Sequence, residues 1–392
     1  MKKTIAVLLV ALVAVACVFA SGSSESEDTY LIGFIGPLTG DNANYGIRCS
    51  NAAKLAISEI NAAGGVNGKD LKLVMEDSEG VADKAIACYE KLAYTDNVVA
   101  IVGPVFTGPA LAVAQRCMED GIVMISPSAT HKDITNQERT GDGKNYVFRT
   151  VPSDALQSEI AAYYFYQVLG YRKLATLYAQ NDYSQGLAVG MSELFEKLGG
   201  EIVASETCMV GDKDFKTQLA RIKNSDAEAV YIPNYTAEIA QILEQGAQLG
   251  VGPFLSGDGF SDQEVYKLAP DYTDGPIYVG PPKAEASTKY DDFVAAYGAM
   301  YNGENPDSFS TNAYDGTYII AGAIAAAGSG DRTAIRDNVA ATKDYQGANG
   351  TMNFAENGDL VSSQGVYKVS GTTPVSQGSF QIQNGQIVKV GD

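Results

Sequence analysis

The chain has 392 residues, of which 45% are hydrophobic and 19% are charged, so about two to three globular domains are expected. Its 47 Asp and Glu residues outnumber 28 Lys and Arg residues, and the formal net charge is −19. Such an acidic surface repels phosphate backbones and anionic lipids, which excludes nucleic acid as a partner. With His131 as the single histidine, we expect no cofactor and no bound metal.

The first 20 residues are typical of a secretory signal, because Lys2 and Lys3 precede a short apolar run. Two cleavage sites compete. Residues 14–17, Ala-Val-Ala-Cys, resemble a bacterial lipobox and would leave Cys17 to be lipidated, whereas Val-Phe-Ala at 18–20 resembles an ordinary signal peptidase site. The polar segment 21–29 suits a tether and favours the lipoprotein. We predict an exported protein, periplasmic or lipid-anchored to the cell envelope.

Two series of alternating strands and helices follow the tether. In the first, strands are expected at 30–35, 71–76, 98–102, 122–125 and 146–150, with helices at 47–63, 82–94 and 109–120. In the second, strands are expected at 174–178, 202–206, 229–232 and 253–255, with helices at 184–198, 215–224 and 236–249. This rhythm predicts an α/β protein with two doubly wound parallel-sheet lobes.

The last third of the chain is less regular. It contains a strand at 276–279, helices at 288–301, 310–327 and 331–341, and a glycine-rich alternating segment at 351–390. We expect it to complete both lobes through a three-segment hinge crossing near 150–152, 274–276 and 354–360. Lobe 1 would hold residues 30–150 and 277–356, and lobe 2 residues 151–276 and 357–392.

Ligands of open parallel sheets bind beyond the carboxyl ends of the strands. In lobe 1 these positions hold hydroxyl groups and free backbone amides, and Thr107 begins a helix, where an anion such as a carboxylate is stabilised. In lobe 2 the positions beyond the strand ends include Asp258, whose carboxylate can bind an ammonium group. Aromatic residues that can enclose an apolar side chain are Tyr45, Phe106, Tyr183, Tyr235 and Tyr314. Together these groups describe a zwitterion with an apolar tail.

Enzyme motifs are absent from the sequence: no P-loop, GxGxxG, GxSxG or HExxH occurs. A Ser-His-Asp triad would have to use His131. We therefore expect a protein without enzymatic activity, with an exported α/β hydrolase using Asp258 as the rival from another class.

Four further cysteines, Cys49, Cys88, Cys117 and Cys208, would lie in an oxidising compartment, and no CxxC motif occurs. With a strand order of 2-1-3-4, right-handed crossovers place the helices carrying Cys88 and Cys117 side by side. A disulfide between them and a pair of buried thiols are both compatible with this arrangement.

Several motifs resemble the leucine/isoleucine/valine-binding proteins, the type I periplasmic solute-binding components of branched-chain amino-acid ABC importers. Residues 32–40, IGFIGPLTG, and 59–69, EINAAGGVNGK, match the opening of that family. The segments 101–104, 124–130, 148–150 and 182–186 keep its order and spacing. The resemblance implies a monomeric receptor that captures an aliphatic, branched-chain type amino acid between closing lobes and delivers it to ABC permease membrane subunits.

The resemblance also implies roles for individual residues. Thr107 would hold the ligand carboxylate, assisted by Thr130, and the Ser128 carbonyl and Thr130 hydroxyl would face the ammonium. The loop that carries these groups includes Ala129, and Asp258 takes a position where the family often has an acid. Family aromatic contacts match Tyr45, Tyr183 and Tyr235.

Two departures from the family pattern concern the ligand. Asp258 is shorter than the family's Glu, and Phe106 replaces a small residue or half-cystine, which would shrink or flatten the side-chain pocket. A smaller aliphatic amino acid or a flat ligand therefore stays open, as does a same-fold receptor for an amide, an aromatic acid or a nucleoside.

Overall fold

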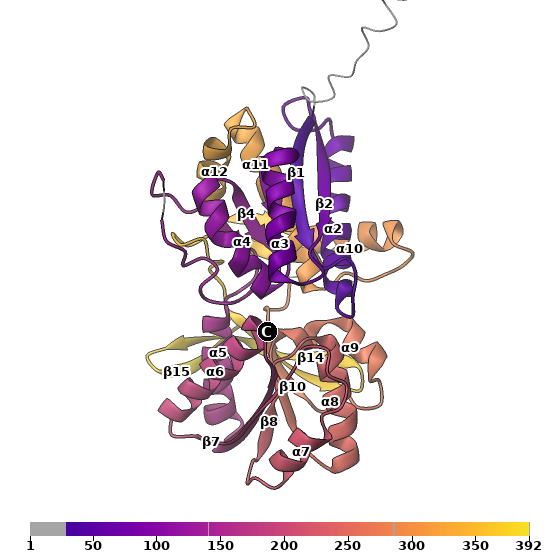
Figure 1. Cartoon of the computed structure of the whole chain (residues 1–392), viewed down its shortest axis with the longest axis vertical. Helices are drawn as coiled ribbons and strands as arrows, with labels where there is room; N and C mark the ends of the chain where they lie inside the picture. The colour runs from indigo at the N-terminus through magenta and orange to yellow at the C-terminus, as the bar shows by residue number, and fades with distance from the viewer. Residues whose placement is uncertain (1–28, 140, 285–286, 392) are drawn as a thin grey trace, which may run out of the picture.

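The computed structural model describes residues 29–139, 141–284 and 287–391, which form two lobes, each built around one main β-sheet (Figure 1). This confirms the predicted α/β architecture with parallel sheets. The predicted signal and Cys17 lie outside the described residues. Within the described residues, no helix is both long and apolar enough to cross a membrane.

Lobe 1 contains a five-stranded sheet in the order β2-β1-β3-β4-β5, with all neighbouring strands parallel. Its strands are β1 (Thr29–Gly36), β2 (Asp70–Asp77), β3 (Ala100–Val102), β4 (Val123–Ser126) and β5 (Val147–Arg149). Right-handed crossovers place α3 and α4 side by side on one face, and α2 packs against α11. The helices are α2 (Ala43–Ala62), α3 (Ala82–Glu90), α4 (Thr107–Asp120), α10 (Thr288–Met300), α11 (Ser308–Ala327) and α12 (Arg332–Ala340).

Lobe 2 contains an eight-stranded sheet in the order β15-β14-β13-β10-β9-β8-β6-β7. The strands from β10 to β7 are parallel, whereas β13, β14 and β15 are antiparallel. The bounds are β6 (Lys173–Ala179), β7 (Glu201–Cys208), β8 (Ala229–Tyr231), β9 (Phe254–Ser256), β10 (Ile277–Gly280), β13 (Gln364–Ser370), β14 (Thr373–Gln383) and β15 (Gln386–Gly391). The helices are α5 (Asp154–Tyr163), α6 (Asp182–Lys197), α7 (Lys216–Lys223), α8 (Thr236–Leu249) and α9 (Gln263–Leu268).

The positions of two hinge crossings differ from the prediction. Strand β10 pairs with β9 and β13 in the sheet of lobe 2, so the chain returns to lobe 1 after Gly280 and not near 274–276. The hairpin of β11 (Tyr345–Gly347) and β12 (Gly350–Met352) and the Phe354–Leu360 bridge precede the last crossing, which lies between residues 361 and 363. An apolar strand pattern does not reveal which of two sheets a strand joins. For this reason the strand at 276–279 was wrongly assigned to lobe 1.

The cysteines in the described residues are free thiols, so the alternative of a Cys88–Cys117 disulfide is wrong. Helices α3 and α4 do pack together. The Cys88 thiol, however, lies 3.5 Å from the Asp77 carbonyl oxygen at the end of β2, while Cys117 is fully buried. Burial raises the pKa of Cys88 to about 11, which makes its thiolate scarce at neutral pH.

Candidate ligand-binding site

The candidate site lies where the carboxyl ends of the two parallel sheets face each other. Thr107 is the first residue of α4 in lobe 1, and Thr130 lies in the loop that follows β4. From lobe 2, Tyr183 lies in the first turn of α6 and Asp258 follows β9. All four side chains are at most 4% exposed, so the structure holds them in a closed cleft.

Asp258 is fixed by hydrogen bonds from its own lobe. The Tyr183 hydroxyl donates to Asp258 Oδ1 at 2.7 Å, and the Gly259 amide donates to the Tyr183 oxygen at 2.8 Å. The Asp258 amide donates to Gln157 Oε1 at 2.8 Å. The carboxylate therefore has a defined position facing the groups of lobe 1.

In the loop after β4, the Thr130 amide donates to Thr107 Oγ1 at 3.4 Å, which joins the two threonines. The Ala129 amide donates to Ser126 Oγ at 3.0 Å and fixes the turn between them, in which Ser128 is partly buried. These contacts place the predicted loop residues next to the start of α4. Direct contact with a ligand stays a prediction.

The sequence prediction missed two polar residues of the site, Asp154 and Tyr231. The Tyr231 hydroxyl is buried without a hydrogen-bond partner among the described residues, and the buried Thr130 hydroxyl and Asp154 carboxylate face each other without a hydrogen bond of ordinary geometry. Burying such groups unpaired costs about 1–3 kcal/mol each, and more for a charge. The Asp154 amide donates to the Thr130 carbonyl at 2.8 Å, so the two residues are neighbours. A ligand with matching polar groups would remove this cost.

The two acids of the site are short of positive charge. Burial raises the pKa of both carboxyls, and the charge of Asp258 raises the pKa of Asp154 further. The nearby cation Arg149 is already engaged, since Nε donates to Asp359 Oδ1 at 2.7 Å and Nη1 to the Thr130 carbonyl at 2.6 Å. A cationic group brought by a ligand would restore the charged form of the acids.

An aromatic cluster borders the polar groups. Phe106 stacks on Tyr235 with ring centroids 4.4 Å apart, and Tyr183 stacks on the same Tyr235 at 4.8 Å. The Tyr45 ring lies 5.4 Å from Phe106, and its hydroxyl donates to the Gly259 carbonyl at 3.2 Å. Four of the five predicted aromatic residues therefore come together across both lobes.

The prediction that Tyr314 belongs to the site is wrong. Its hydroxyl donates to Glu59 Oε2 at 2.5 Å, and its ring packs against Phe293 at 4.5 Å within lobe 1. Phe309 of the same helix lies 5.8 Å from Tyr45 and takes the place that we assigned to Tyr314. Residues five apart on a helix point about 140° away from each other, so both cannot face the cleft.

Ion pairs and hydrogen bonds hold the lobes together beside the cleft. Arg48 of α2 is 3% exposed, and its Nη1 lies 2.5 Å from Oδ1 of the fully buried Asp262 of lobe 2. Asn44 Nδ2 also donates to Asp262. Within lobe 1, Arg48 pairs with Glu304 at 3.3 Å and with Asp307 at 3.5 Å. The Arg48–Asp262 pair therefore exists only while the lobes are closed on each other.

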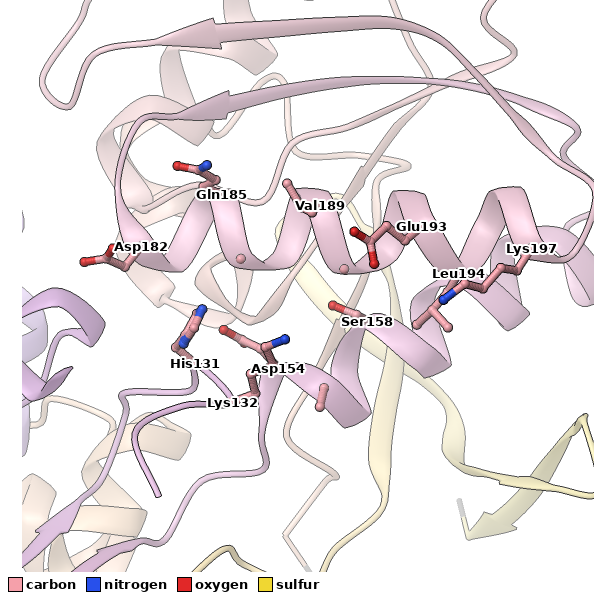
Figure 2. Close-up of a pocket in the computed structure, with 13 residues that line it drawn as sticks. His131, Lys132, Asp154, Ser158, Asp182, Gln185, Val189, Glu193, Leu194 and Lys197 are labelled. Carbon is pink, nitrogen blue, oxygen red and sulfur yellow. The ribbon is translucent and has the colours of Figure 1, made fainter. Parts of the chain in front are cut away.

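Two cavities lie next to the candidate site. One, of about 620 Å³, opens between the lobes and is lined in part by Phe106 and Tyr235. The other, of about 520 Å³, runs along α6, where Figure 2 shows His131 and Asp154 facing the first turns of the helix. His131 is partly buried against Gly186, and burial lowers its pKa.

The fold and the site define a class of protein: two α/β lobes that enclose a small ligand in the cleft between them. A family model described as periplasmic binding protein matches residues 29–373, and the chain belongs to this family, in its leucine/isoleucine/valine-binding branch. This confirms the resemblance read from the motifs. No group of three or more His, Cys, Asp or Glu side chains that could hold a metal occurs in the described part of the chain.

Individual relatives are similar over most of their length. The chain is 31% identical over 345 residues to the Leu/Ile/Val-binding protein BraC3 of Rhizobium johnstonii, covering 86% of this chain and 90% of that protein. It is 29% identical to a leucine-, isoleucine-, valine-, threonine- and alanine-binding protein of Pseudomonas aeruginosa, covering 86% and 88%. Among solved structures, the isoleucine complex of LivJ from Streptococcus pneumoniae has a TM-score of 0.81 at 30% identity, covering 92% of this chain and 100% of that chain.

Proposed function

We propose that this solute-binding protein is an extracytoplasmic receptor that captures an aliphatic α-amino acid between its lobes and delivers it to the membrane subunits of an ABC permease. The observation that carries the proposal is the set of buried polar groups Thr130, Asp154 and Tyr231 beside Asp258, in which the Thr130 hydroxyl faces the Asp154 carboxylate and the Tyr231 hydroxyl has no partner among the described residues. The names of relatives such as BraC3 support an amino acid as the ligand.

Each charged group of an amino acid has a matching environment. Its carboxylate would lie at the start of α4, where the Thr107 hydroxyl and the positive end of the helix dipole stabilise an anion. Its ammonium would lie against Asp258 and Asp154, two carboxyl groups whose pKa values are raised by burial. The carboxylate binds lobe 1 and the ammonium mainly lobe 2, so the ligand favours the closed form.

No chemical conversion of the ligand is required. Closure over the ligand excludes water, strengthens the charged hydrogen bonds and forms the joined surface of both lobes that a permease would recognise. Mass spectrometry of candidate amino acids and their amides after incubation with the protein would reveal an enzyme by its product. Unchanged ligands are the expected result.

Isothermal titration calorimetry with a panel of α-amino acids tests the proposal. Replacing Asp258 by Asn keeps its shape and removes its charge, so we expect binding to weaken by roughly 2–4 kcal/mol, or about 30- to 1,000-fold. Asp226→Asn is the matched control, because Asp226 lies on the surface of lobe 2 with its side chain 87% exposed. Equal affinity of Asp258→Asn and wild type would refute the assignment of the ammonium site.

A further inference from the structure

Phe106 lies directly beside the proposed carboxylate site. It immediately precedes Thr107, and its side chain is 7% exposed. Its ring is stacked on Tyr235 with an interplanar angle of 23°, and Tyr183 is stacked on Tyr235 with an angle of 20°. Phe106, Tyr235 and Tyr183 therefore form a continuous stack of three rings that crosses from lobe 1 to lobe 2.

The neighbours of this three-ring stack hold Phe106 in place. A Cβ atom on Gly80 would lie 3.0 Å from the Phe106 ring, so the turn at Gly80 contacts the ring closely from outside the stack. On another side lies Tyr45, whose hydroxyl is bound to the Gly259 carbonyl and accepts a hydrogen bond from Thr236 at 2.9 Å. Gly80 and Tyr45 therefore restrict the Phe106 ring on two sides.

The ring spacing leaves no layer for an aliphatic side chain. Apolar groups in contact are about 4 Å apart, so a chain inserted between two rings needs about 8 Å between them. The centroids in the stack are 4.4 and 4.8 Å apart. The side chain of a ligand held at Thr107 and Asp258 therefore cannot extend between these rings.

The cavity of about 620 Å³ lies beyond this stack. Its lining includes Phe106 and Tyr235, but Thr107, Tyr183 and Asp258 are not among the described residues that line it. The Phe106–Tyr235 pair thus separates the polar groups from a space large enough for a long side chain. Removal of the Phe106 ring would connect the polar groups of the site with this cavity.

We propose that Phe106 limits the size of the ligand's side chain, so that the wild-type protein prefers α-amino acids with short side chains, such as alanine, over leucine and isoleucine. This inference rests on the proposed function and narrows its substrate class. Phe106→Ala then opens the site toward the cavity and admits the longer chains.

Calorimetric titrations of wild type and Phe106→Ala with alanine, 2-aminobutyrate, valine, leucine and isoleucine test this proposal. Wild type is expected to bind alanine at least about tenfold more tightly than leucine. In Phe106→Ala, the leucine dissociation constant is expected to fall by at least about tenfold, with a smaller change for alanine. Phe293→Ala is the matched control: it removes a buried ring of lobe 1 that packs on Tyr314, and it should keep the preference for alanine.

The outcomes separate the two proposals. Wild type that binds leucine as tightly as alanine overturns the role of Phe106 and leaves the proposed function standing. Absence of binding to every amino acid in the panel removes the proposed function and this inference with it. A folded Phe106→Ala protein without improved leucine binding also overturns the role of Phe106. If circular dichroism shows that Phe106→Ala is unfolded, Phe106→Val and the wild-type preference decide the question.

Discussion

Arg48→Met should weaken ligand binding although Arg48 lies outside the proposed ligand contacts. Methionine keeps the apolar stem but removes the cation that faces Asp262 across the lobes. In the open form Asp262 would face water, whereas in the closed form it is fully buried. Closing the variant therefore buries a carboxylate that has lost its cation, and the open form gains population at the expense of the binding form.

The size of the effect is bounded by protonation of Asp262. Burial already raises the pKa of this carboxyl and Arg48 lowers it, so without Arg48 the closed form would take up a proton. Protonating a carboxyl with an open-form pKa of about 3.9 costs about 4 kcal/mol at pH 7 and about 1.5 kcal/mol at pH 5. We expect affinity to fall by up to about 1,000-fold at pH 7 and by about tenfold at pH 5. The ion pair between Arg48 and Asp307 lies within lobe 1, so its loss affects the open and closed forms alike. Its contribution to the difference in free energy between the two forms therefore largely cancels.

Calorimetry at pH 7 and pH 5, combined with small-angle X-ray scattering of the ligand-free protein, measures both consequences. The scattering should show a larger radius of gyration for Arg48→Met than for wild type at pH 7. Arg221→Met is the control, because it removes an arginine that pairs with Glu206 on the surface of lobe 2 and is 65% exposed. Wild-type affinity in Arg48→Met at pH 7, or a defect that does not change with pH, would refute the reasoning.

Three further predictions concern the carboxylate site, the thiols and the N-terminus. Thr107→Val should weaken amino-acid binding by about 1–2 kcal/mol, less than Asp258→Asn, because the positive end of the α4 dipole remains; an unchanged ligand-induced thermal shift would contradict this. Thiol titration of denatured, unreduced protein beginning at residue 21 should give four free thiols, whereas two would indicate a disulfide. Cys17→Ala should move the protein from the detergent phase to the aqueous phase in Triton X-114 partitioning, and identical partitioning of variant and wild type would exclude lipidation at Cys17.

The fold was largely predictable because the alternation of strand and helix patterns is local. Buried runs such as Val123–Ser126 and stop signals such as Gly121, which adopts φ +65°, are visible in the sequence. The sheet that strand β10 joins could not be predicted from the sequence, because both lobes offer a sheet edge. The choice depends on pairing with β13, which lies far along the chain. Helix α5 was also missed, although Ser153 caps it by accepting a hydrogen bond from the Leu156 amide.

Part of the candidate site could be predicted because ligands of open parallel sheets bind beyond the carboxyl ends of the strands. This rule identified a set of residues that follow strands: Thr107, Thr130, Tyr183 and Asp258. Asp154 was not predicted because it begins a helix after the hinge, and only the structure shows its carboxylate buried near Asp258. Phe309 and Tyr314 are both plausible from sequence, and the rotation of α11 decides between them.

The most direct test of the central claim is calorimetric titration of the wild-type protein with its best-binding α-amino acid and with the N-acetyl derivative of that amino acid. Acetylation removes the ammonium charge and leaves the carboxylate and the side chain. Because a buried charged pair would be lost, we predict that the derivative binds at least about 30-fold more weakly. Equal affinity for the two compounds would show that Asp258 and Asp154 do not receive an ammonium group, and would contradict the account of the site.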